Sequence, residues 1–304
     1  MYRPTRRDLF AAPVGLLLAQ KLSALPLASI KLGVTTDEIH DDVLTASKFL
    51  REHGLKWAEV RNIWGPYNTA QPIEKVREAA RIFDENGIRV SIEGTGFFKI
   101  PLPAETPEGQ QILDKQWALL DGALERAKVF GTDKLRVFSF TLGRGEGPAS
   151  EKTLARIHEL MREAARRAKG YRLAIENVGG AHVETGAQLA ALLKHVKEDN
   201  IGATWDPNNA GAAGEQSYPE GYGKLDPARI FHVHLRDYKK GPDGKVGWAA
   251  VGDGEFDNLG QIRALLKAGY KEAFTLETHW QSPKGKMFAT ETSLAGLLKV
   301  IEKV

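Results

Sequence analysis

The sequence predicts an α/β protein whose fold is a single-domain (β/α)8 barrel, or TIM barrel. Two observations predict it. Short apolar segments of strand length alternate eight times with longer amphipathic stretches between residues 29 and 304. Eight strand–helix units in a segment of this length match the size of such a barrel. The alternative is a doubly wound open sheet, but no Gly-rich phosphate-binding loop follows the first strand to favour it.

The predicted strands are short apolar runs, and the helices between them show apolar residues at helical spacing. One helix, 71–86, has Pro72 near its first turn and Gly87 just past its end, which is the usual asymmetry of helix termini. The predicted strands cover 30–35, 57–61, 89–94, 134–140, 171–177, 201–206, 230–237 and 273–279. The other predicted helices cover 37–53, 107–130, 150–169, 185–198, 258–268 and 286–303, and a short one follows residue 206.

Residues 1–28 differ from the rest of the chain and are typical of a twin-arginine signal peptide. Arg6 and Arg7 directly precede an apolar run, 9–19, which is too short to span a bilayer of about 30 Å as a helix. Small residues follow this run, as they do before signal-peptide cleavage sites. The pair of arginines favours the twin-arginine export route over a plain amphipathic helix. We therefore expect an exported, periplasmic protein without stable membrane insertion, whose domain is 29–304.

Composition and charge exclude several kinds of function. The chain has no Cys, so disulfides, thiolate zinc sites and a cysteine nucleophile are excluded. Residues 1–28 hold four basic residues and one acidic residue, which leaves 38 of the 42 basic and 38 of the 39 acidic residues in the remainder. A body of zero formal net charge has no overall field for attracting nucleic acid or an anionic membrane. The composition is compatible with a homo-oligomer.

Four polar residues stand at the ends of the last four predicted strands. Large apolar residues, such as Phe231, Val233 and Leu235 on the seventh strand, should face the helices, so the residues between them point into the barrel. Active sites of such barrels lie at the C-terminal ends of the strands. By this alternation the residues that should meet there are Glu176, Asp206, His234 and Glu277.

Three carboxylates and one imidazole held so close predict a site for one divalent metal ion, because like charges need a cation between them. The donor set suits Mn²⁺, Mg²⁺, Co²⁺ or Zn²⁺. His232 lies one layer deeper, so we expect it either to support the cluster from behind or to be a hydrogen-bonded core histidine. Four other histidines fall on predicted helices and should be solvated: His40, His53, His158 and His195.

Other polar residues of the strands predict structural or substrate-binding roles. Glu59 with Arg61 and Ser91 with Glu93 share a phase on strands two and three, which predicts a buried polar layer with mutual pairing. Arg61 also lies near the mouth, where it can bind a substrate oxygen. Aromatic residues crowd the strand ends and should mostly cap the barrel. Trp248 is the exception, because it lies in the Gly-rich segment 240–255, which is suited to a lid.

The strand-end motifs resemble those of the xylose-isomerase-like barrel superfamily, in particular sugar phosphate isomerases/epimerases and endonuclease IV. The similarity covers the chain after residue 28. The resemblance implies that Glu176, Asp206, His234 and Glu277 are metal ligands and that the two glutamates also act as acid and base on opposite faces of a sugar. It rests on Ile175-Glu176-Asn177, Trp205-Asp206-Pro207-Asn208-Asn209, His232-Val233-His234-Leu235-Arg236-Asp237, Val251-Gly252-Asp253-Gly254-Glu255 and Thr275-Leu276-Glu277.

Departures from the ketose 3-epimerase pattern mark further candidate substrate-binding residues. Asn209 stands where the epimerases carry a histidine, Lys240 where they carry an arginine, and His182 where they carry a substrate-contacting glutamate. Together with Arg61 and Trp248 these residues are the expected sugar contacts. The departures indicate a sugar site whose substrate differs from that of an ordinary ketose 3-epimerase.

The expected function is therefore that of a metal-dependent sugar isomerase or epimerase. It would act on a free or oxidised (keto) sugar by proton transfer through an enediolate. The alternative is a lyase or dehydratase acting on 3-keto sugars or inososes, because loss of the same proton is its first step. Two other functions are less favoured: a non-catalytic exported sugar-binding barrel, and an endonuclease IV-like phosphodiesterase. The phosphodiesterase chemistry uses extra histidines after the second and third strands, and this chain has none in the stretches 61–64 and 94–98.

Overall fold

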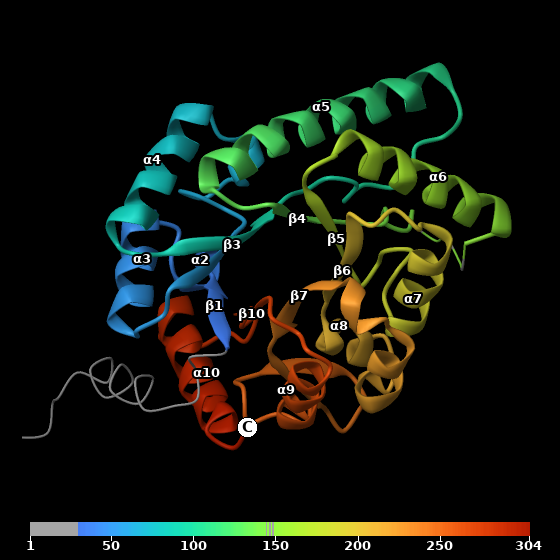
Figure 1. Ribbon diagram of the computed structural model, residues 1–304. Helices are drawn as coiled ribbons and strands as arrows, with labels where there is room; N and C mark the ends of the chain where they lie inside the picture. Colours follow the sequence, from blue (N-terminus) through green and yellow to red (C-terminus); the bar gives the residue numbers. More distant parts are fainter. Residues whose placement is uncertain (1–29, 144, 146, 148) are drawn as a thin grey trace, which may run out of the picture.

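The computed structural model describes residues 30–143, 145, 147 and 149–304 of the chain. The predicted signal peptide, 1–28, lies outside the described residues. Within the described residues, no helix is long and apolar enough to cross a membrane. Eight parallel strands form a closed barrel in the order β1-β10-β7-β6-β5-β4-β3-β2, and helices surround it (Figure 1). The predicted (β/α)8 barrel is therefore confirmed.

Most strands of the barrel are one to three residues shorter than predicted, whereas β3 has the predicted bounds. Several predicted strand-end residues, such as Asp206 and Glu277, therefore follow the last residue of their strands. The barrel strands are β1 (Lys31–Thr35), β2 (Trp57–Val60), β3 (Arg89–Gly94), β4 (Lys134–Val137), β5 (Arg172–Glu176), β6 (Ile201–Trp205), β7 (Ile230–Leu235) and β10 (Ala273–Leu276).

The helices follow the predicted order with one correction. The predicted helix 37–53 is two helices, because His40 is extended (φ −160°, ψ 150°) and the Asp42 side chain caps a new helix by accepting from Thr45 N. The α-helices are α2 (Thr36–Ile39), α3 (Val43–Glu52), α4 (Ile73–Glu85), α5 (Pro107–Phe130), α6 (Glu151–Arg167), α7 (Gly186–His195), α8 (Pro207–Ala212), α9 (Asn258–Lys267) and α10 (Lys286–Ile301). Short helical turns cover Asn68–Ala70, Ser217–Gly221, Tyr222–Lys224 and Pro227–Arg229.

A hairpin stands outside the barrel after β7. The strands β8 (Asp237–Lys240) and β9 (Val246–Ala249) pair antiparallel, with Tyr238 opposite Trp248. The Gly-rich segment predicted as a lid therefore begins as an ordered hairpin. Asp237 ties its base together, because its carboxylate accepts from the backbone N–H groups of Gly252 and Phe256.

The core confirms most of the predicted alternation, with one correction at the base of the barrel. Phe231, predicted to face the helices, packs instead with Ile92 and Ala174 in a small cluster separate from the main core. These residues come from β3, β5 and β7, the alternate strands that fill one layer of a barrel interior. A register shift where Thr204 of β6 pairs with β7 accounts for the different phase.

The predicted polar layer on β2 and β3 is wrong in its pairing. Within residues 30–143, 145, 147 and 149–304, Glu93 pairs with neither Ser91 nor Glu59, and both its carboxylate oxygens are buried without a hydrogen bond. Burial raises the pKa of Glu93 well above its usual range, against the opposing charge of Arg126 on α5. Strand neighbours in phase therefore need not pair with one another.

Among the four histidines expected in solvent, His53 is the clear correction. Its ring is 4% exposed, stacks on Phe49 with a 4.0 Å centroid distance, and lies with Nδ1 2.8 Å from the Phe49 carbonyl oxygen. It ends α3, so the apolar face of that helix carries the histidine into the core.

Candidate metal centre at the mouth of the barrel

The barrel brings the four predicted residues together. Glu176 ends β5, Asp206 follows β6, His234 lies on β7 and Glu277 follows β10, so four neighbouring strands each supply one side chain. One ligand atom from each lies within 4.8 Å of the others. None of the four is more than 3% exposed. The arrangement is a buried cluster of three carboxylates around one imidazole.

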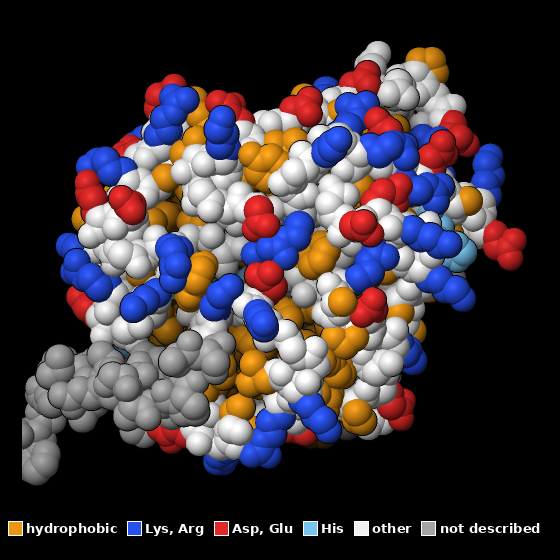
Figure 2. All heavy atoms as spheres, viewed as in Figure 1, with side chains coloured by type: hydrophobic (Ala, Val, Ile, Leu, Met, Phe, Trp, Pro, Cys, Tyr) orange, Lys and Arg blue, Asp and Glu red, His pale blue; other side chains and the backbone are white. Residues whose placement is uncertain are grey.

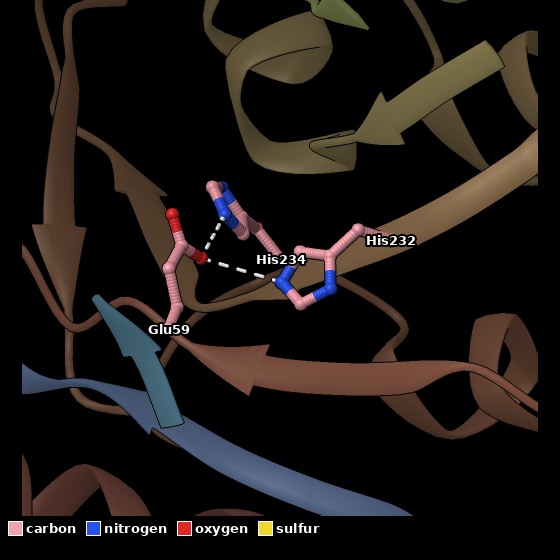
Figure 3. Close-up of side chains that lie close together, drawn as sticks. All are labelled: Glu59, His232 and His234. Atoms are coloured by element: carbon pink, nitrogen blue, oxygen red, sulfur yellow. Dashed lines mark hydrogen bonds and ion pairs between the residues drawn. The ribbon is translucent and has the colours of Figure 1, made fainter. Parts of the chain in front are cut away.

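The two nitrogens of His234 face different partners. Nε2 lies 2.8 Å from Glu59 Oε2 on β2, the contact drawn in Figure 3. Nδ1 points into the cluster, at 3.4 Å from Glu176 Oε1, 3.5 Å from Asp206 Oδ2 and 3.3 Å from Glu277 Oε2. No hydrogen bond reaches Nδ1 within the described residues. A carboxylate behind a histidine that presents its other nitrogen is the usual arrangement behind a metal-binding imidazole.

Asp206 divides its oxygens between the fold and the cluster. Oδ1 accepts from the backbone N–H groups of Asn208 and Asn209 and so caps α8. Oδ2 faces His234 and accepts from Arg236. The loop is held in turn by Asn177, whose amide accepts from Asp206 N and donates to the Asp206 carbonyl oxygen. Capping thus fixes which oxygen faces the cluster.

Glu59 is a second correction to the predicted layer. It is fully buried and pairs with His234, with His232 at 3.3 Å and with Arg136 at 3.1 Å, rather than with Arg61. His232 therefore supports the cluster from behind, through Glu59 (Figure 3). Strand two places Glu59 behind the imidazole of strand seven, across the barrel interior, and no sequence pattern could show that.

Three arginines surround the carboxylates. Arg136 Nη1 lies 3.3 Å from Glu176 Oε2 and 3.6 Å from Glu277 Oε1, and Arg236 binds Asp206. Arg61 Nη1 lies 2.6 Å from Glu277 Oε1. Arg136 and Arg236 were missed as site residues, although Arg136 alternates with apolar Leu135 and Val137 and Arg236 shares the phase of His234. This alternation is the sequence pattern from which both arginines could have been predicted to point into the barrel.

Burial and charge act in opposite directions on the ionisable groups of the cluster. Burial by itself lowers the pKa of His234, but Glu59 and Glu277 raise that pKa well above its usual range. Burial likewise raises the pKa of Glu277, whereas His279 and His234 bring it well below the usual value. At Glu59, burial again raises the pKa, but the charges of His234 and Arg136 outweigh it and lower the pKa well below its usual value. Opposite charges therefore outweigh burial at both Glu59 and Glu277.

The residues fit a divalent cation. Within the described residues, four buried carboxylates, those of Glu59, Glu176, Asp206 and Glu277, face the guanidinium groups of Arg136 and Arg236 and the imidazole of His234. Arg61 is shared with Asp37 and Glu38, and an imidazole that binds a metal is neutral, so the positive charge then falls short. Glu277 Oε2, like His234 Nδ1, is buried and has no hydrogen bond among the described residues. A divalent ion would supply the missing charge and occupy both orphaned atoms. The set of three oxygen donors and one nitrogen donor suits Mn²⁺, Mg²⁺, Co²⁺ or Zn²⁺.

A neighbouring group, Glu38, Glu277 and His279, also brings three ligand atoms within 4.8 Å of one another, but its atoms are already engaged. Arg61 Nη2 lies 2.9 Å from Glu38 Oε1, and Arg236 donates to His279 Nδ1. The other nitrogen of His279 therefore carries its proton and points at the carboxylates, at 3.4 Å from Glu38 Oε1. This group is better described as a hydrogen-bonded rim than as a second metal centre.

Of the predicted substrate-binding residues, some lie beside the carboxylate–imidazole cluster and others lie away from it. Asn209 lies at the cluster, with Nδ2 3.5 Å from Glu176 Oε1, and Arg61 touches Glu277. Trp248 covers Arg236, whose guanidinium carbon is 4.1 Å from the indole centroid. Lys240 is exposed on the hairpin, and no contact within the described residues joins its side chain to the cluster. His182 is buried and lines a cavity between α6 and α7.

Fold and site together define a (β/α)8 barrel with a buried carboxylate–imidazole centre at the mouth. Residues 48–301 match the model of the xylose isomerase-like TIM barrel family, and the chain belongs to that family. This confirms the resemblance found in the sequence motifs. No curated protein matches the chain.

Solved structures of low sequence identity share the fold. The IOLI protein with a bound zinc atom superposes with a TM-score of 0.72 at 17% identity, covering 90% of this chain and 99% of that one. D-allulose 3-epimerase from Methylomonas sp. in complex with D-allulose gives 0.69 at 18%, covering 89% and 97%. A probable 3-DHS dehydratase, AsbF, from Bacillus anthracis gives 0.68 at 17%, covering 90% and 98%.

Proposed function

We propose that the protein is a divalent-metal-dependent isomerase or epimerase that acts on a free or oxidised (keto) sugar. The observation that carries the proposal is the orientation of His234. Its Nδ1 is buried, receives no hydrogen bond from the part of the chain that the structure describes, and faces one carboxylate from each of three other strands. Glu176, Asp206, His234 and Glu277 would hold the ion. When bound, the ion supplies positive charge for the enediolate that forms as a substrate proton leaves.

The two glutamates are suited to proton transfer because they approach the cluster from different sides. β5 and β10 are separated in the barrel by β6 and β7, so Glu176 and Glu277 stand across the centre from each other. One carboxylate can then remove a proton beside the carbonyl group while the other returns one from the opposite face. Arg61 and Arg136 orient the Glu277 carboxylate through Oε1.

The partly exposed residues at the rim supply the contacts expected for a sugar. Arg61, Glu38 and His279 form a hydrogen-bonded rim beside Glu277, and Trp248 packs edge-on to His279 with a 5.9 Å centroid distance. Polar side chains beside an aromatic ring suit a ligand with hydroxyl groups and apolar C–H faces. A protein with this fold has been solved in complex with D-allulose, which supports a sugar as the class of ligand.

A lyase or dehydratase acting on a 3-keto sugar or inosose is the second candidate. His279 favours it, because the ring lies 3.5 Å from Glu277 Oε1 and its side chain is 33% exposed toward the mouth. A proton donor beside the base can help a hydroxyl group to leave after the same proton abstraction. The fold shared with a protein described as a 3-DHS dehydratase is compatible with this reaction.

Metal content tests the centre first. We expect purified protein to bind one divalent ion, and Asp206→Ala and His234→Ala to lose it. His195→Ala, which removes an imidazole from the exposed end of α7, is the matched control and should bind metal normally. Equal metal content in all four proteins would reject the centre.

Isotope exchange then tests the reaction. Incubation of the metal-loaded protein with ketoses and 3-keto sugars in D₂O should place deuterium on a carbon beside the carbonyl. An isomer or epimer as product supports the first candidate, and loss of water supports the second. A bound sugar that exchanges no carbon-bound hydrogen would reject both and indicate a binding protein.

A further inference from the structure

The hairpin of β8 and β9 presents one of its faces to the mouth of the barrel. In an antiparallel pair, residues directly opposite one another project from the same face, and here Tyr238 lies opposite Trp248. The indole of Trp248 covers Arg236, whose guanidinium carbon lies 4.1 Å from the ring centroid, and meets the His279 ring at a centroid distance of 5.9 Å. Tyr238 therefore projects from the same face as the ring that borders the rim.

Tyr238 packs against α8, the helix that follows the proposed metal ligand Asp206. A methyl group on Gly211 would lie 2.7 Å from Tyr238 Oη and 2.8 Å from two carbon atoms of the ring, which is closer than van der Waals contact allows. The ring of Tyr238 therefore lies against the bare backbone of Gly211, where any side chain would displace it.

Backbone conformation gives no reason for a glycine at position 211. Gly211 lies within α8 (Pro207–Ala212) and is not among the described residues with positive φ. Glycine is less favourable than alanine in a helix, because it loses more conformational freedom on folding. The packing of Tyr238 supplies the reason instead. The missing side chain at Gly211 is thus a feature of the contact between α8 and the hairpin.

The base of the hairpin is held in place as well. Asp237 is 1% exposed, and its carboxylate accepts from four backbone N–H groups, those of Tyr238, Gly252, Gly254 and Phe256. Four donors on one buried carboxylate join the chain before the hairpin to the chain after it. The hairpin is therefore anchored at two places, at its base and on α8.

We propose that Gly211 and Tyr238 are positioning residues, which set Trp248 as a wall of the substrate site. The inference rests on the proposed function and deepens it by naming what holds its aromatic contact in place. Asp206 caps α8, so the helix that carries the hairpin is tied to a proposed metal ligand. The spacing between Trp248 and the metal centre is then set by the packing of one ring on one glycine, and a sugar that reaches the centre has to fit this spacing.

Fluorine NMR of protein labelled with 5-fluorotryptophan reports the position of Trp248. Its signal is assigned as the one missing from Trp248→Phe. We expect Gly211→Ala to shift that signal, and Tyr238→Ala, which removes the ring instead, to shift it too. Gly223→Ala adds a methyl group in open space on an exposed turn and should leave the signal in place. A Trp248 signal that stays unmoved in the first two variants would overturn the proposal.

Sugar binding tests whether that position matters for the site. D-allulose and 3-keto-D-glucose are the probes, titrated calorimetrically into Mg²⁺-loaded protein. Gly211→Ala should weaken sugar binding about three- to tenfold, comparable to the loss of one aromatic contact, with metal affinity unchanged. In a Trp248→Ala background the same exchange should have no further effect, because its effect passes through Trp248. Unchanged sugar affinity in Gly211→Ala, or an equal loss in the Trp248→Ala background, would overturn the positioning role.

The outcomes separate this inference from the proposed function. Failure of metal loading, or of both sugars to bind the wild-type protein, would count against the proposed function. The fluorine signal would still decide whether Gly211 and Tyr238 hold Trp248 in place. Loss of metal affinity in Gly211→Ala would overturn the inference, because it would assign Gly211 to the integrity of α8 and its capping residue Asp206.

Discussion

At the scale of single residues, the site is held by partners that carry opposite charge from other strands. Glu59 holds the imidazole of His234 from behind, and Arg136 bridges Glu59 and Glu176. All of these side chains are almost fully buried, so each charge depends on its neighbours for stability. The orientation of the proposed metal ligands is therefore a property of the network.

Replacing Glu59 tests that dependence. Glu59→Gln keeps the size of the side chain but removes the charge behind His234, and should weaken metal binding about 10- to 100-fold, the usual effect of losing a carboxylate behind a metal-bound histidine. Calorimetric titration with Mn²⁺ or Zn²⁺ measures it. Glu93→Gln introduces the same amide at another buried glutamate, on β3, whose pKa is raised by burial, so it controls for the exchange of side chain and should leave metal affinity unchanged. Wild-type affinity in Glu59→Gln would show that Glu59 has no part in positioning His234.

Glutamine variants of the two proposed acid–base residues should lose turnover while they retain metal binding. Glu176→Gln and Glu277→Gln each retain an oxygen donor, so metal binding should survive at reduced affinity, while turnover should fall about 10²- to 10⁴-fold. Each single variant should still exchange one substrate proton with D₂O from its intact side. Near wild-type turnover in both variants with metal bound would assign the glutamates to metal binding alone.

At the scale of elements, the strand ends carry most of the unusual backbone. Among the residues that the structure describes, four other than Gly have positive φ: Trp64 (50°), Phe98 (60°), Phe140 (64°) and His279 (48°). They follow β2, β3, β4 and β10, on the side of the barrel where the proposed site lies. Such conformations carry strain and tend to gather at functional sites. The aromatic rings of Phe98 and Phe140 stack, with centroids 4.1 Å apart, and so cap the barrel as predicted.

The strand β3 carries a buried group whose effect on stability depends on pH. Glu93 has a raised pKa in the folded state, so it keeps its proton above pH 4.5, where the unfolded chain has lost it. Stability should therefore fall as pH rises through this window, because the folded state then binds more protons than the unfolded state. Glu93→Gln should remove that dependence and stabilise the protein by about 1 kcal/mol at pH 8, with less gain at pH 5.

Urea unfolding at the two pH values measures the difference. A gain that is equal at pH 5 and pH 8 would mean that Glu93 is ionised in the folded protein.

At the scale of the whole molecule, closure of the barrel determines which residues meet. β1 pairs with β10 as well as with β2, so residues far apart in the chain become neighbours, as Glu38 and His279, 241 positions apart, do through the His279 N–H. On the face seen in Figure 2, positive and negative side chains are interspersed rather than gathered by sign. This agrees with the neutral body expected from the sequence.

Export is the prediction that concerns the whole chain. Arg6 and Arg7 precede the apolar run of the predicted signal peptide, so Arg6→Lys with Arg7→Lys should leave a full-length precursor in the cytoplasm. Immunoblots of cytoplasmic and periplasmic fractions measure this. Lys31→Arg, a basic exchange beyond the signal, is the control and should be exported. Normal processing of the double variant would refute the twin-arginine assignment.

The sequence by itself determined the barrel and the four residues at the ends of its last strands. Both follow from local periodicity: strand length and helix length predict the alternation, and the period of two along a strand predicts which side chains point inward. Helix ends also follow from the local sequence. Gly131, for example, ends α5 because it adopts the left-handed conformation, with φ 69°. Where the alternation failed, as at Phe231, a register shift between β6 and β7 had changed the phase.

Only the tertiary structure decided how these side chains are partnered. Glu59 pairs with His234 rather than with Arg61, Arg136 joins the site from β4, and His182 lines a cavity outside the barrel. The reason is that pairing depends on distances between strands far apart in the sequence, and these distances are set by closure of the barrel and the stagger of its strands. Local patterns show which way a side chain points; only the closed barrel shows what it meets there.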